Sequence, residues 1–434
     1  MAEQKRKFRE FIWATYDFAD TIFSMNVVSL YFPLLVVSDF GAPDMYVSVA
    51  NSISQLLVVF LAPIFGLLSD RVGKRMGFFW SFALGTALGT IAIRLGASMG
   101  TLGLVLVSFV VANVSYQLSL TFYNSLLPRV AKPERWGVVS GLGTALGYVG
   151  SIAGMAIVMP FNTGSLFGLR VPIPAGGRIA TFIPTALLFF AFALPTLIYF
   201  WLDERKRKYP AEKSQVQGLK AIFETLSDSK KYPGIRRFLL ARLFYQEAVE
   251  TTIIFMGVFA EKAMGMDDAS KIAFFIIATT AAIFGSFLWG RVTDSIGAHR
   301  ALIYDLIGWV IGLLAIAFFP HRVVFWAVGA WLGVMLGGVW TTSRPYLLRL
   351  APKDAVGRFF GLYSMTGKAA AVVGPLVWGA TTLLFAPLGQ RIAYQAAVAM
   401  MAVLVTVGML IIMKNKDIEM LIKSQFEQGG NIEE

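Results

Sequence analysis

The chain contains no cysteine and only two histidines among 434 residues. It therefore forms no disulfide, and it lacks the ligands of Cys/His zinc sites, the motif that attaches c-type haem and any cysteine nucleophile. Nucleotide-binding motifs are missing as well. GLGTALGYVGSIAG has Leu146 where G-x-G-x-x-G needs glycine, and GLYSMTGKA has Ala369 where a P-loop needs serine or threonine. We expect no bound cofactor, no metal and no enzymatic activity.

Charged residues are also scarce, at 15% of the chain, whereas a soluble domain carries about 25%. Hydrophobic residues make up 56%, and apolar runs of about 20 residues recur throughout, which is typical of a polytopic helical membrane protein. The basic N-terminus resembles a signal peptide, but the apolar run after it is too long and contains acids, so we interpret it as a transmembrane helix. The runs predict twelve transmembrane helices, at about 10–36, 45–69, 76–96, 101–127, 137–160, 178–202, 236–261, 268–292, 299–320, 322–350, 357–384 and 391–413.

Lysine and arginine are distributed unevenly between the two sides of this predicted topology. Of the 38, 28 fall on the side of both termini, six fall on the opposite side and four lie within helices. This bias predicts that both termini are cytoplasmic, so the net charge of +12 is an orientation signal and no sign of nucleic-acid binding. The chain divides into an all-α bundle of six helices at 1–202, a cytoplasmic loop at 203–235, a second six-helix bundle at 236–413 and a cytoplasmic tail at 414–434.

The two predicted bundles resemble each other in sequence. GLLSDRVGKR and GRVTDSIGAHR share the pattern G-x-x-x-D-x-x-G at an offset of 224, each after the second helix of its half. A second match, at an offset of 220, aligns PRVAKPERWGVVSGLG with LRLAPKDAVGRFFGLY. Two matching loops at nearly one offset indicate an internal duplication.

Parallel six-helix repeats are the plan of major facilitator transporters, which place the solute site between the repeats near the middle of the bilayer. GLLSDRVGKR resembles the signature loop of that superfamily. YDFAD, FYNSLLPRVAKPERWGVVSGLGTALGYVG and RFFGLYSMTGKAAAVVGPLVWG resemble its vacuole-effluxer-like branch, whose autophagy-related members export amino acids. The chain departs from that branch at Asp20 and Thr21 in the first helix, and at Glu247 and Glu250 in the seventh. The resemblance therefore implies the fold more firmly than the solute.

Two pairs of acids lie inside predicted transmembrane helices, where ionisable residues are costly and mark functional sites. Asp17 and Asp20 in the first helix and Glu247 and Glu250 in the seventh have the same spacing and coincide at an offset of 230. Each pair shares one helix face. The acids are candidates for proton coupling or for binding a cationic group. Alternatively, they are held in permanent salt bridges by the intramembrane cations Arg94, Arg242, Arg344 and Lys368.

A polar stripe at helical spacing runs along the fourth predicted helix, and such a face must contact protein or water. With the intramembrane cations it predicts a solute site: Arg344 and Lys368 would hold a carboxylate, and tyrosines would supply amphipathic walls. Helix–helix hydrogen bonds are the alternative role. The predicted solute-binding residues are Tyr16, Asn113, Tyr116, Gln117, Tyr123, Asn124, Tyr245, Arg344 and Lys368.

The signature loops suggest a conformational latch on the cytoplasmic side. Asp70 is placed to accept hydrogen bonds from the N-terminus of a facing helix, where the helix dipole favours an anion. The family resemblance implies that this contact holds one conformation and breaks in the other, whereas a plain topological turn is the alternative. The predicted latch residues are Gly66, Asp70, Arg71, Gly73, Arg75 and Asp294.

These features together predict a secondary active transporter for a small polar or zwitterionic solute, working by alternating access and coupled to protons. Efflux of amino acids is what the resemblance implies. We expect a monomer with both termini in the cytoplasm, in the plasma (inner) membrane of a prokaryote. A carrier for a drug, a sugar or a metal cation, whose oxygen ligands the acids would supply, and a non-transporting sensor on a transporter fold are the alternatives.

Overall fold

The computed structural model describes residues 2–72, 75–131, 136–206, 232–351, 359, 363, 366–367 and 371–415. These residues are almost entirely helical. The strands described are the two-residue β1 (Ser165–Leu166) and β2 (Leu169–Arg170), which pair antiparallel with Ser165 opposite Arg170. The predicted all-α class is confirmed.

The first part of the chain begins with one long helical rod that changes type along its length. It starts as α1 (Ala2–Phe23), continues as the π-helix η1 (Ser24–Tyr31), passes through α2 (Phe32–Leu34) and ends as the π-helix η2 (Leu35–Asp39). The elements that follow are α3 (Asp44–Val72), α4 (Arg75–Ser98), α5 (Leu102–Ser125), α6 (Leu127–Val130), α7 (Trp136–Thr163), the 3₁₀ turn η4 (Arg178–Thr181) and α8 (Phe182–Lys206).

The second part of the chain forms a similar series. Its elements are α10 (Pro233–Lys262), α11 (Asp268–Ile296), α12 (Ala298–Phe318), α13 (Arg322–Leu350), α15 (Val373–Phe385), the 3₁₀ turn η6 (Ala386–Leu388) and α16 (Gln390–Met413).

The rod that contains α1 is longer than the sequence predicts. The apolar pattern gives 10–36, whereas the helix runs from residue 2 to residue 39. Its extra N-terminal turns are polar and carry helical ion pairs, such as Lys7 with Glu3 at 3.3 Å and Arg6 with Glu10 at 3.7 Å. An apolar pattern cannot reveal such turns, because they lie outside the hydrocarbon.

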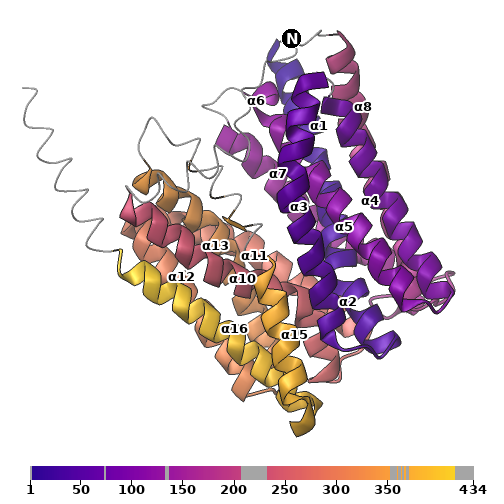
Figure 1. The fold of residues 1–434 in the computed structure, drawn as a ribbon, viewed down its shortest axis with the longest axis vertical. Coiled ribbons are helices and arrows are strands. Elements are labelled where there is room, and N and C mark those ends of the chain that lie inside the picture. The colour runs from indigo at the N-terminus through magenta and orange to yellow at the C-terminus, as the bar shows by residue number, and fades with distance from the viewer. Residues whose placement is uncertain are drawn as a thin grey trace, which may run out of the picture.

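The helices form two groups, α1 to α8 and α10 to α16, which touch at one end and diverge toward the end that carries the N-terminus (Figure 1). We call the N-terminal end the tail side and the opposite end, where α1's rod ends and α3 begins, the far side. The two groups pack together through α3 against α15 and α7 against α11. At the first junction, Ser52 Oγ donates to the carbonyl oxygen of Val372 at 2.7 Å. The contact between halves is therefore concentrated on the far side.

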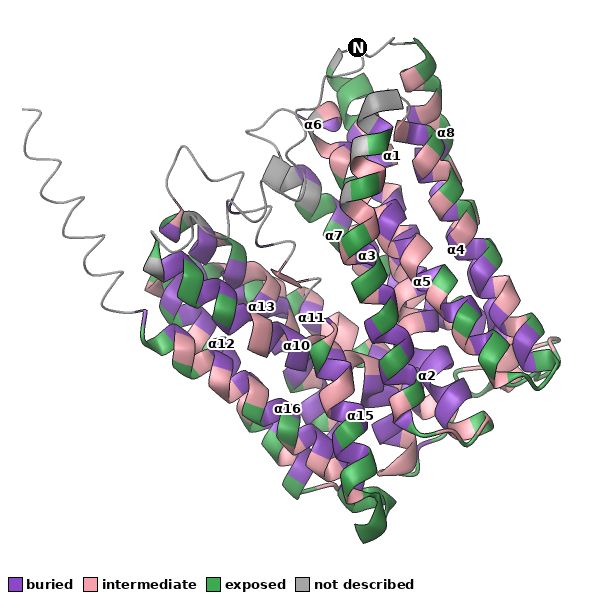
Figure 2. Cartoon of the chain, viewed as in Figure 1, coloured by how far each residue is buried: buried purple, intermediate pink, exposed green. Residues whose placement is uncertain are grey.

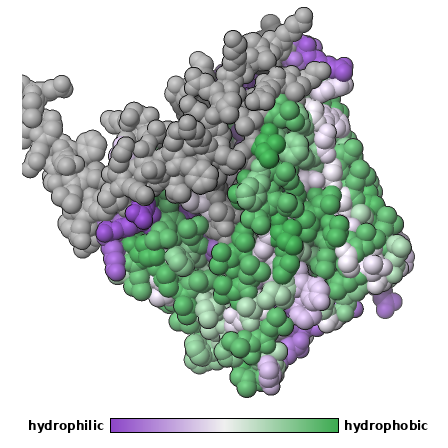
Figure 3. All heavy atoms as spheres, viewed as in Figure 1, coloured by the Kyte–Doolittle hydropathy of each residue, from purple (hydrophilic) through white to green (hydrophobic). Residues whose placement is uncertain are grey.

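The outer surface of both groups is apolar, as expected for contact with lipid. Figure 3 shows hydrophobic side chains over most of the visible face of the helices, and Figure 2 shows exposed residues along their outer sides. Ten of the described helical segments are long and apolar enough to cross a membrane. The count of twelve stays a prediction, because α10 has charged residues in its middle and α15 follows residues outside the described part.

Glycines of α7 let that helix approach α1 closely. A Cβ at Gly150 would overlap the carbonyl oxygen of Phe18, and a Cβ at Gly147 would lie 3.1 Å from Thr21 Cγ2. The small residues of this run, which does not match a nucleotide-binding motif, thus allow the close approach of a neighbouring backbone.

Replacing Gly150 by alanine should therefore destabilise the protein, because α1 and α7 must separate to admit the methyl group. We expect a loss of about 1–3 kcal/mol, typical of overpacking, visible as a lower apparent Tm in detergent. Gly141→Ala is the matched control on the same helix, because a Cβ there meets nothing within 4 Å. Equal stability of the two variants would contradict the close α1–α7 packing.

Candidate functional site

Asp17 and Asp20 lie on α1 and are each bound by a tyrosine of α5. The Tyr123 hydroxyl donates to Asp17 Oδ2 at 2.6 Å, and the Tyr116 hydroxyl donates to Asp20 Oδ2 at 3.3 Å. Asp20 is 6% exposed, and its other oxygen, Oδ1, has no hydrogen-bond partner. Gly143 of α7 leaves room for Asp17, since a Cβ at that glycine would overlap Oδ2. The first acid pair thus sits where three helices of the first half meet.

Glu247 and Glu250 lie on α10 in a comparable setting. Glu247 is buried and accepts a hydrogen bond from the backbone N–H of Gly374 on α15, while its Oε1 has no partner. The Gln246 side chain donates to Glu250 Oε1 at 2.7 Å. Each half places a glycine against an acid of its first helix, Gly143 against Asp17 and Gly374 against Glu247. These glycines are not matched by the repeat, because the offset of 220 pairs Gly374 with Gly154. The acids are thus duplicated in sequence, but their donors differ: tyrosines of α5 in the first half, and a backbone N–H and Gln246 in the second.

No cation in the described part of the chain lies within salt-bridge distance of these four carboxylates. Arg242, five residues before Glu247, donates instead to the carbonyl oxygen of Tyr363 and to Thr366 Oγ1, and its guanidinium lies 3.6 Å from the Tyr363 ring centre. Lys368 lies outside the described residues. The acids are held by neutral donors, and a permanent salt bridge from Arg94, Arg242 or Arg344 is not formed in this structure.

Two of the tyrosines expected as walls of a solute site are instead buried inside their own halves. Tyr16 and Tyr245 are fully buried. Tyr16 donates to Ser119 Oγ at 2.7 Å, and Tyr245 pairs with Ser343 Oγ at 3.0 Å. Tyr16 and Tyr245 therefore do not line an open surface in this structure. The helical pattern predicts which side chains share one face of a helix. It does not predict the serine partners, because these lie on other helices.

The polar stripe of α5 runs from the buried core to an exposed end. Asn113 is 1% exposed, and neither its Oδ1 nor its Nδ2 has a partner. Gln117 is half-buried, and Asn124, in the last turn of α5, is exposed. The stripe thus offers unused amide groups at its deep end and solvent access at the tail side.

Arg344 is exposed on α13, at the position that the repeat matches with Asn124. Its charge acts on the carboxylate of Asp17 and on Tyr148 of α7, both in the other half. A cation of the second half is therefore near enough to act on an acid of the first half, on the side where the halves diverge.

The far side is closed by an ion cluster that joins the halves. Arg178 binds Asp39 at 2.7 Å, which belongs to its own half, and it also binds Asp268 at 2.9 Å and Glu261, which belong to the second half. Lys271, fully buried, binds Asp268 at 2.6 Å and also Glu261. Two cations and three carboxylates from both halves therefore bind one another.

Two neutral donors add further links between the halves on the far side. Asn162 of α7 donates to Asp268 Oδ2 at 2.6 Å. Tyr394 of α16 donates to Asp44 Oδ2 at 2.7 Å, at the start of α3. Sequence reasoning did not identify this contact set, because it counts Arg178 and Lys271 only as scattered far-side charges.

The predicted latch lies partly outside the described residues. Gly73 and the side chains of Asp70 and Arg71 are among those not described, whereas Gly66 is half-buried and Asp294 is exposed. One of the described contacts on the tail side involves Arg75 and a residue that the sequence did not single out. Glu204, near the end of α8, accepts from the backbone N–H groups of Arg75 and Met76, both at 3.1 Å, and so caps α4.

Known proteins resemble this chain both in sequence and in fold. A sequence profile of the family described as "Vacuole effluxer Atg22 like" matches residues 43–417. The chain belongs to this family. It is similar to YxiO of Bacillus subtilis (strain 168), described as an uncharacterized MFS-type transporter, with 26% identity over 86% of this chain and 88% of the relative. An uncharacterized protein of Aquifex aeolicus is 29% identical over 86% of this chain and 89% of its own length.

Fungal members of the Atg22-like family match over a shorter part. Autophagy-related protein 22-1 of Neosartorya fischeri is 24% identical over 56% of this chain and 43% of its own length. Among solved structures, a mutant of the nucleoside transporter NupG has a TM-score of 0.74 at 12% identity, covering 94% of this chain and 99% of that one. A bacterial homologue of the human lysosomal transporter Spinster, inward-facing and unoccupied, has a TM-score of 0.70 at 14% identity, covering 94% and 96%.

These comparisons confirm the predicted superfamily and branch. The chain is a multi-pass membrane transporter of the major facilitator type, and it carries the Atg22-like family's sequence pattern over most of its length. The structural likenesses establish the fold alone, because their sequence identities are low.

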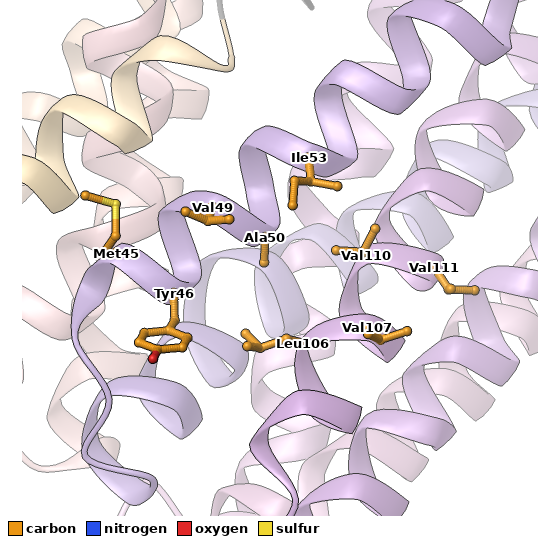
Figure 4. A pocket seen from close by; sticks show the side chains of 9 residues that line it. All are labelled: Met45, Tyr46, Val49, Ala50, Ile53, Leu106, Val107, Val110 and Val111. Atoms are coloured by element: carbon orange, nitrogen blue, oxygen red, sulfur yellow. The ribbon is translucent and has the colours of Figure 1, made fainter.

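One apolar groove on this Atg22-like chain is not part of the acid site. It has a volume of about 560 Å³ and lies between α3 and α5, where Figure 4 shows Tyr46 and Ala50 of α3 on one side and Leu106 and Val110 of α5 on the other. Several of its lining side chains are exposed on the outer surface. With apolar walls and no charged residue, this groove suits lipid tails rather than a polar solute.

Proposed function

We propose that this chain is a secondary active transporter for a small zwitterionic, amino-acid-like solute, which it moves by alternating access coupled to protons. The observation that supports the proposal is that the two halves carry opposite charges on the side where they diverge. Asp17 lies on α1 with Tyr123 as its donor, and the exposed Arg344 of α13 is near enough for its charge to act on Asp17. A solute with an ammonium and a carboxylate group would satisfy both.

The arrangement of the halves supports an inward-facing state. The far side is held shut by the Arg178 cluster and by Tyr394 with Asp44, whereas the halves diverge toward the tail side (Figure 1). Because lysine and arginine are concentrated on the tail side, that side is proposed to be cytoplasmic, in the inner membrane of a prokaryote. A solute would then enter from the cytoplasm, consistent with efflux.

Proton coupling is supported by the four carboxylates of α1 and α10. Asp20 Oδ1 and Glu247 Oε1 are buried oxygens without a partner, and no cation of the described chain neutralises any of the four. A carboxylate kept out of water without a counter-charge is expensive, so these groups exchange protons more readily than a salt-bridged acid would.

Uptake into proteoliposomes tests the proposed function. With the purified chain, a panel of amino acids, sugars and cationic drugs, and an imposed pH gradient, we expect gradient-driven accumulation of at least one amino acid. Arg344→Ala should reduce this flux at least about tenfold, since a charge-assisted hydrogen bond contributes about 1.5–3 kcal/mol. Arg300→Ala is the control, because Arg300 is an exposed arginine at the tail-side start of α12.

The outcomes separate the alternatives. Accumulation of a sugar or a drug, with no amino acid transported, would replace the proposed solute class. Flux that does not respond to the pH gradient would remove proton coupling. An absence of flux for every compound would leave a binding or sensing role, which equilibrium binding to the same panel would then measure.

A further inference from the structure

Asp305 is a buried acid that the central site does not use. It lies in the middle of α12, outside the acid pairs that recur in both halves. It is 0% exposed, and neither Oδ1 nor Oδ2 has a hydrogen-bond partner. No other acid in the described part of the chain is both fully buried and without a partner on both oxygens.

Among the residues that the structure describes, the groups around Asp305 are neutral. Its carboxyl group occupies the space above Gly338 of α13, where a Cβ would overlap Oδ1 and would lie 2.7 Å from Trp289 Cδ1 of α11. The indole Nε1 of Trp289 has no hydrogen-bond partner either. Thr342, one turn beyond Gly338, donates to the Gly338 carbonyl oxygen at 2.9 Å.

No charged group of the neighbouring helices faces this acid. Arg291 of α11 is two residues from Trp289, hence on the opposite helix face, and it is exposed, as is Arg344 of α13. In α16 the charged residue is Arg391, at the far-side end. The titratable side chain near enough to interact with Asp305 is Tyr245 of α10, whose hydroxyl is already paired with Ser343.

The duplication shows that packing alone does not require an acid here. Gly85 and Gly89 of α4 contact Ser115 and Ala112 of α5, while Gly308 and Gly312 of α12 contact Met335 and Leu332 of α13. This register, which matches Gly85 with Gly308 and Gly89 with Gly312, also matches Phe82 with Asp305.

In the first half that position is aromatic. Phe82 lies 5.9 Å from Phe122, ring centre to ring centre, and 5.0 Å from Phe65. Since an apolar residue fills the equivalent place between α4 and α5, the carboxyl group on α12 is a specific feature of the second half.

We propose that Asp305 is a proton-binding site of the second half, separate from the central acids, and that it carries its proton in the conformation described here. An ionised carboxylate with no donor and no counter-charge in a membrane-embedded core is strongly unfavourable. The neutral acid carries no net charge, so burying it without a hydrogen-bond partner costs much less than burying the carboxylate. The Trp289 indole N–H beside it is the group positioned to stabilise the anion if a rearrangement of α11 or α13 brings it closer.

Infrared spectroscopy of the purified full chain in lipid nanodiscs tests this site without reference to any solute. At pH 7 the wild type should show a carbonyl-stretch band of a protonated carboxylic acid that Asp305→Asn lacks. Asp20→Asn and Glu250→Gln should keep that band, which separates Asp305 from the central acids. Trp289→Phe should keep the band and shift its frequency.

A stability measurement gives a second readout. Because the unfolded chain releases the proton above the usual carboxyl range and the folded chain retains it, wild-type stability falls as pH rises. The apparent Tm of Asp305→Asn relative to wild type should therefore increase by about 2 °C or more between pH 5 and pH 8. Identical infrared bands in wild type and Asp305→Asn, or a Tm difference that does not change with pH, would overturn the proposal.

Discussion

Replacing Asp20 by asparagine is expected to abolish gradient-driven transport while leaving exchange of solute across the membrane intact. Asparagine has nearly the same shape and still accepts from Tyr116, but it cannot bind and release a proton. If the proton carried by Asp20 drives accumulation, the initial rate of pH-driven uptake should fall at least about tenfold, equivalent to about 1.4 kcal/mol. Counterflow in proteoliposomes without a pH gradient measures the exchange that should persist.

Glu250→Gln is the paired variant, because the duplication places Glu250 opposite Asp20 in the repeat. Asp267→Asn serves as the matched control, since Asp267 is an exposed acid beside α11 on the far side. If both Asp20→Asn and Glu250→Gln accumulate solute at the wild-type rate, these two acids have no coupling role. Loss in one variant only would identify the half that carries the proton.

Replacing Arg178 by alanine is expected to open the far side and to lower stability. Without Arg178, Asp39 loses the cation that binds it, while Glu261 and Asp268 keep Lys271, and the two halves lose this ionic link. Removing one partner of a largely buried ion pair costs about 3–5 kcal/mol. Arg178 is 14% exposed, so solvent screening places the expected loss at the lower end of that range.

Distance measurements between spin labels can follow the accompanying change of conformation. The chain contains no cysteine, so Arg205→Cys on α8 and Arg300→Cys on α12 introduce the only two labelling sites, both exposed on the tail side. In an otherwise wild-type chain we expect a long distance, and with Arg178→Ala a shift toward shorter distances. Arg391→Ala, an exposed far-side arginine, should leave the distribution unchanged. The same distribution in Arg178→Ala and wild type would show that the cluster does not hold the far side shut.

The sequence predicted the architecture well because duplication and hydropathy are both visible along the chain. The repeated loops located the halves, and the acids at an offset of 230 identified two positions where the structure places a glycine against an acid. The twelve-helix count could not be derived with equal strength. The charged residues in α10, the reason that helix is of interest, are the same residues that weaken its membrane signal.

Contacts between the halves could not be predicted from the sequence alone. Arg178 and Asp268 are far apart along the chain, and nothing in their local sequence indicates that they touch. The tyrosines show a different limit. Tyr123 and Tyr16 were both assigned to the solute site, but one donates to Asp17 and the other to Ser119. Helical periodicity gives the direction of a side chain, whereas its partner depends on how neighbouring helices are rotated.

Asp305 carried a signal that a stricter reading would have found. It is a single acid within an otherwise apolar run, and an ionisable residue at such a position is a functional hypothesis by default. Asp305 has no matching acid in the first half, whereas the predicted site acids recur in both halves. The repeat matches it with Phe82, so a feature present in one half only escaped a comparison based on similarity.

The π-helical turns of the first rod have no counterpart in α10, the equivalent helix of the second half. The first rod continues from Asp20 through two π-helical segments to Asp39. In the second half, α10 ends at Lys262, a shorter stretch of chain beyond Glu250, and it contains no π-helical segment. A π turn holds more residues than an α turn, and its backbone hydrogen bonds can be exchanged for α-type bonds without breaking the rod.

Conversion of one such turn would lengthen the rod and rotate the Asp39 end relative to the Asp20 end. The first rod therefore joins a central acid to Asp39, which binds the same Arg178 that links the two halves on the far side. In the second half, α10 contains no π-helical turn that could be converted in this way. The duplicated halves thus share a plan, but of the two helices that carry the central acids only the first contains turns whose conversion would change its length.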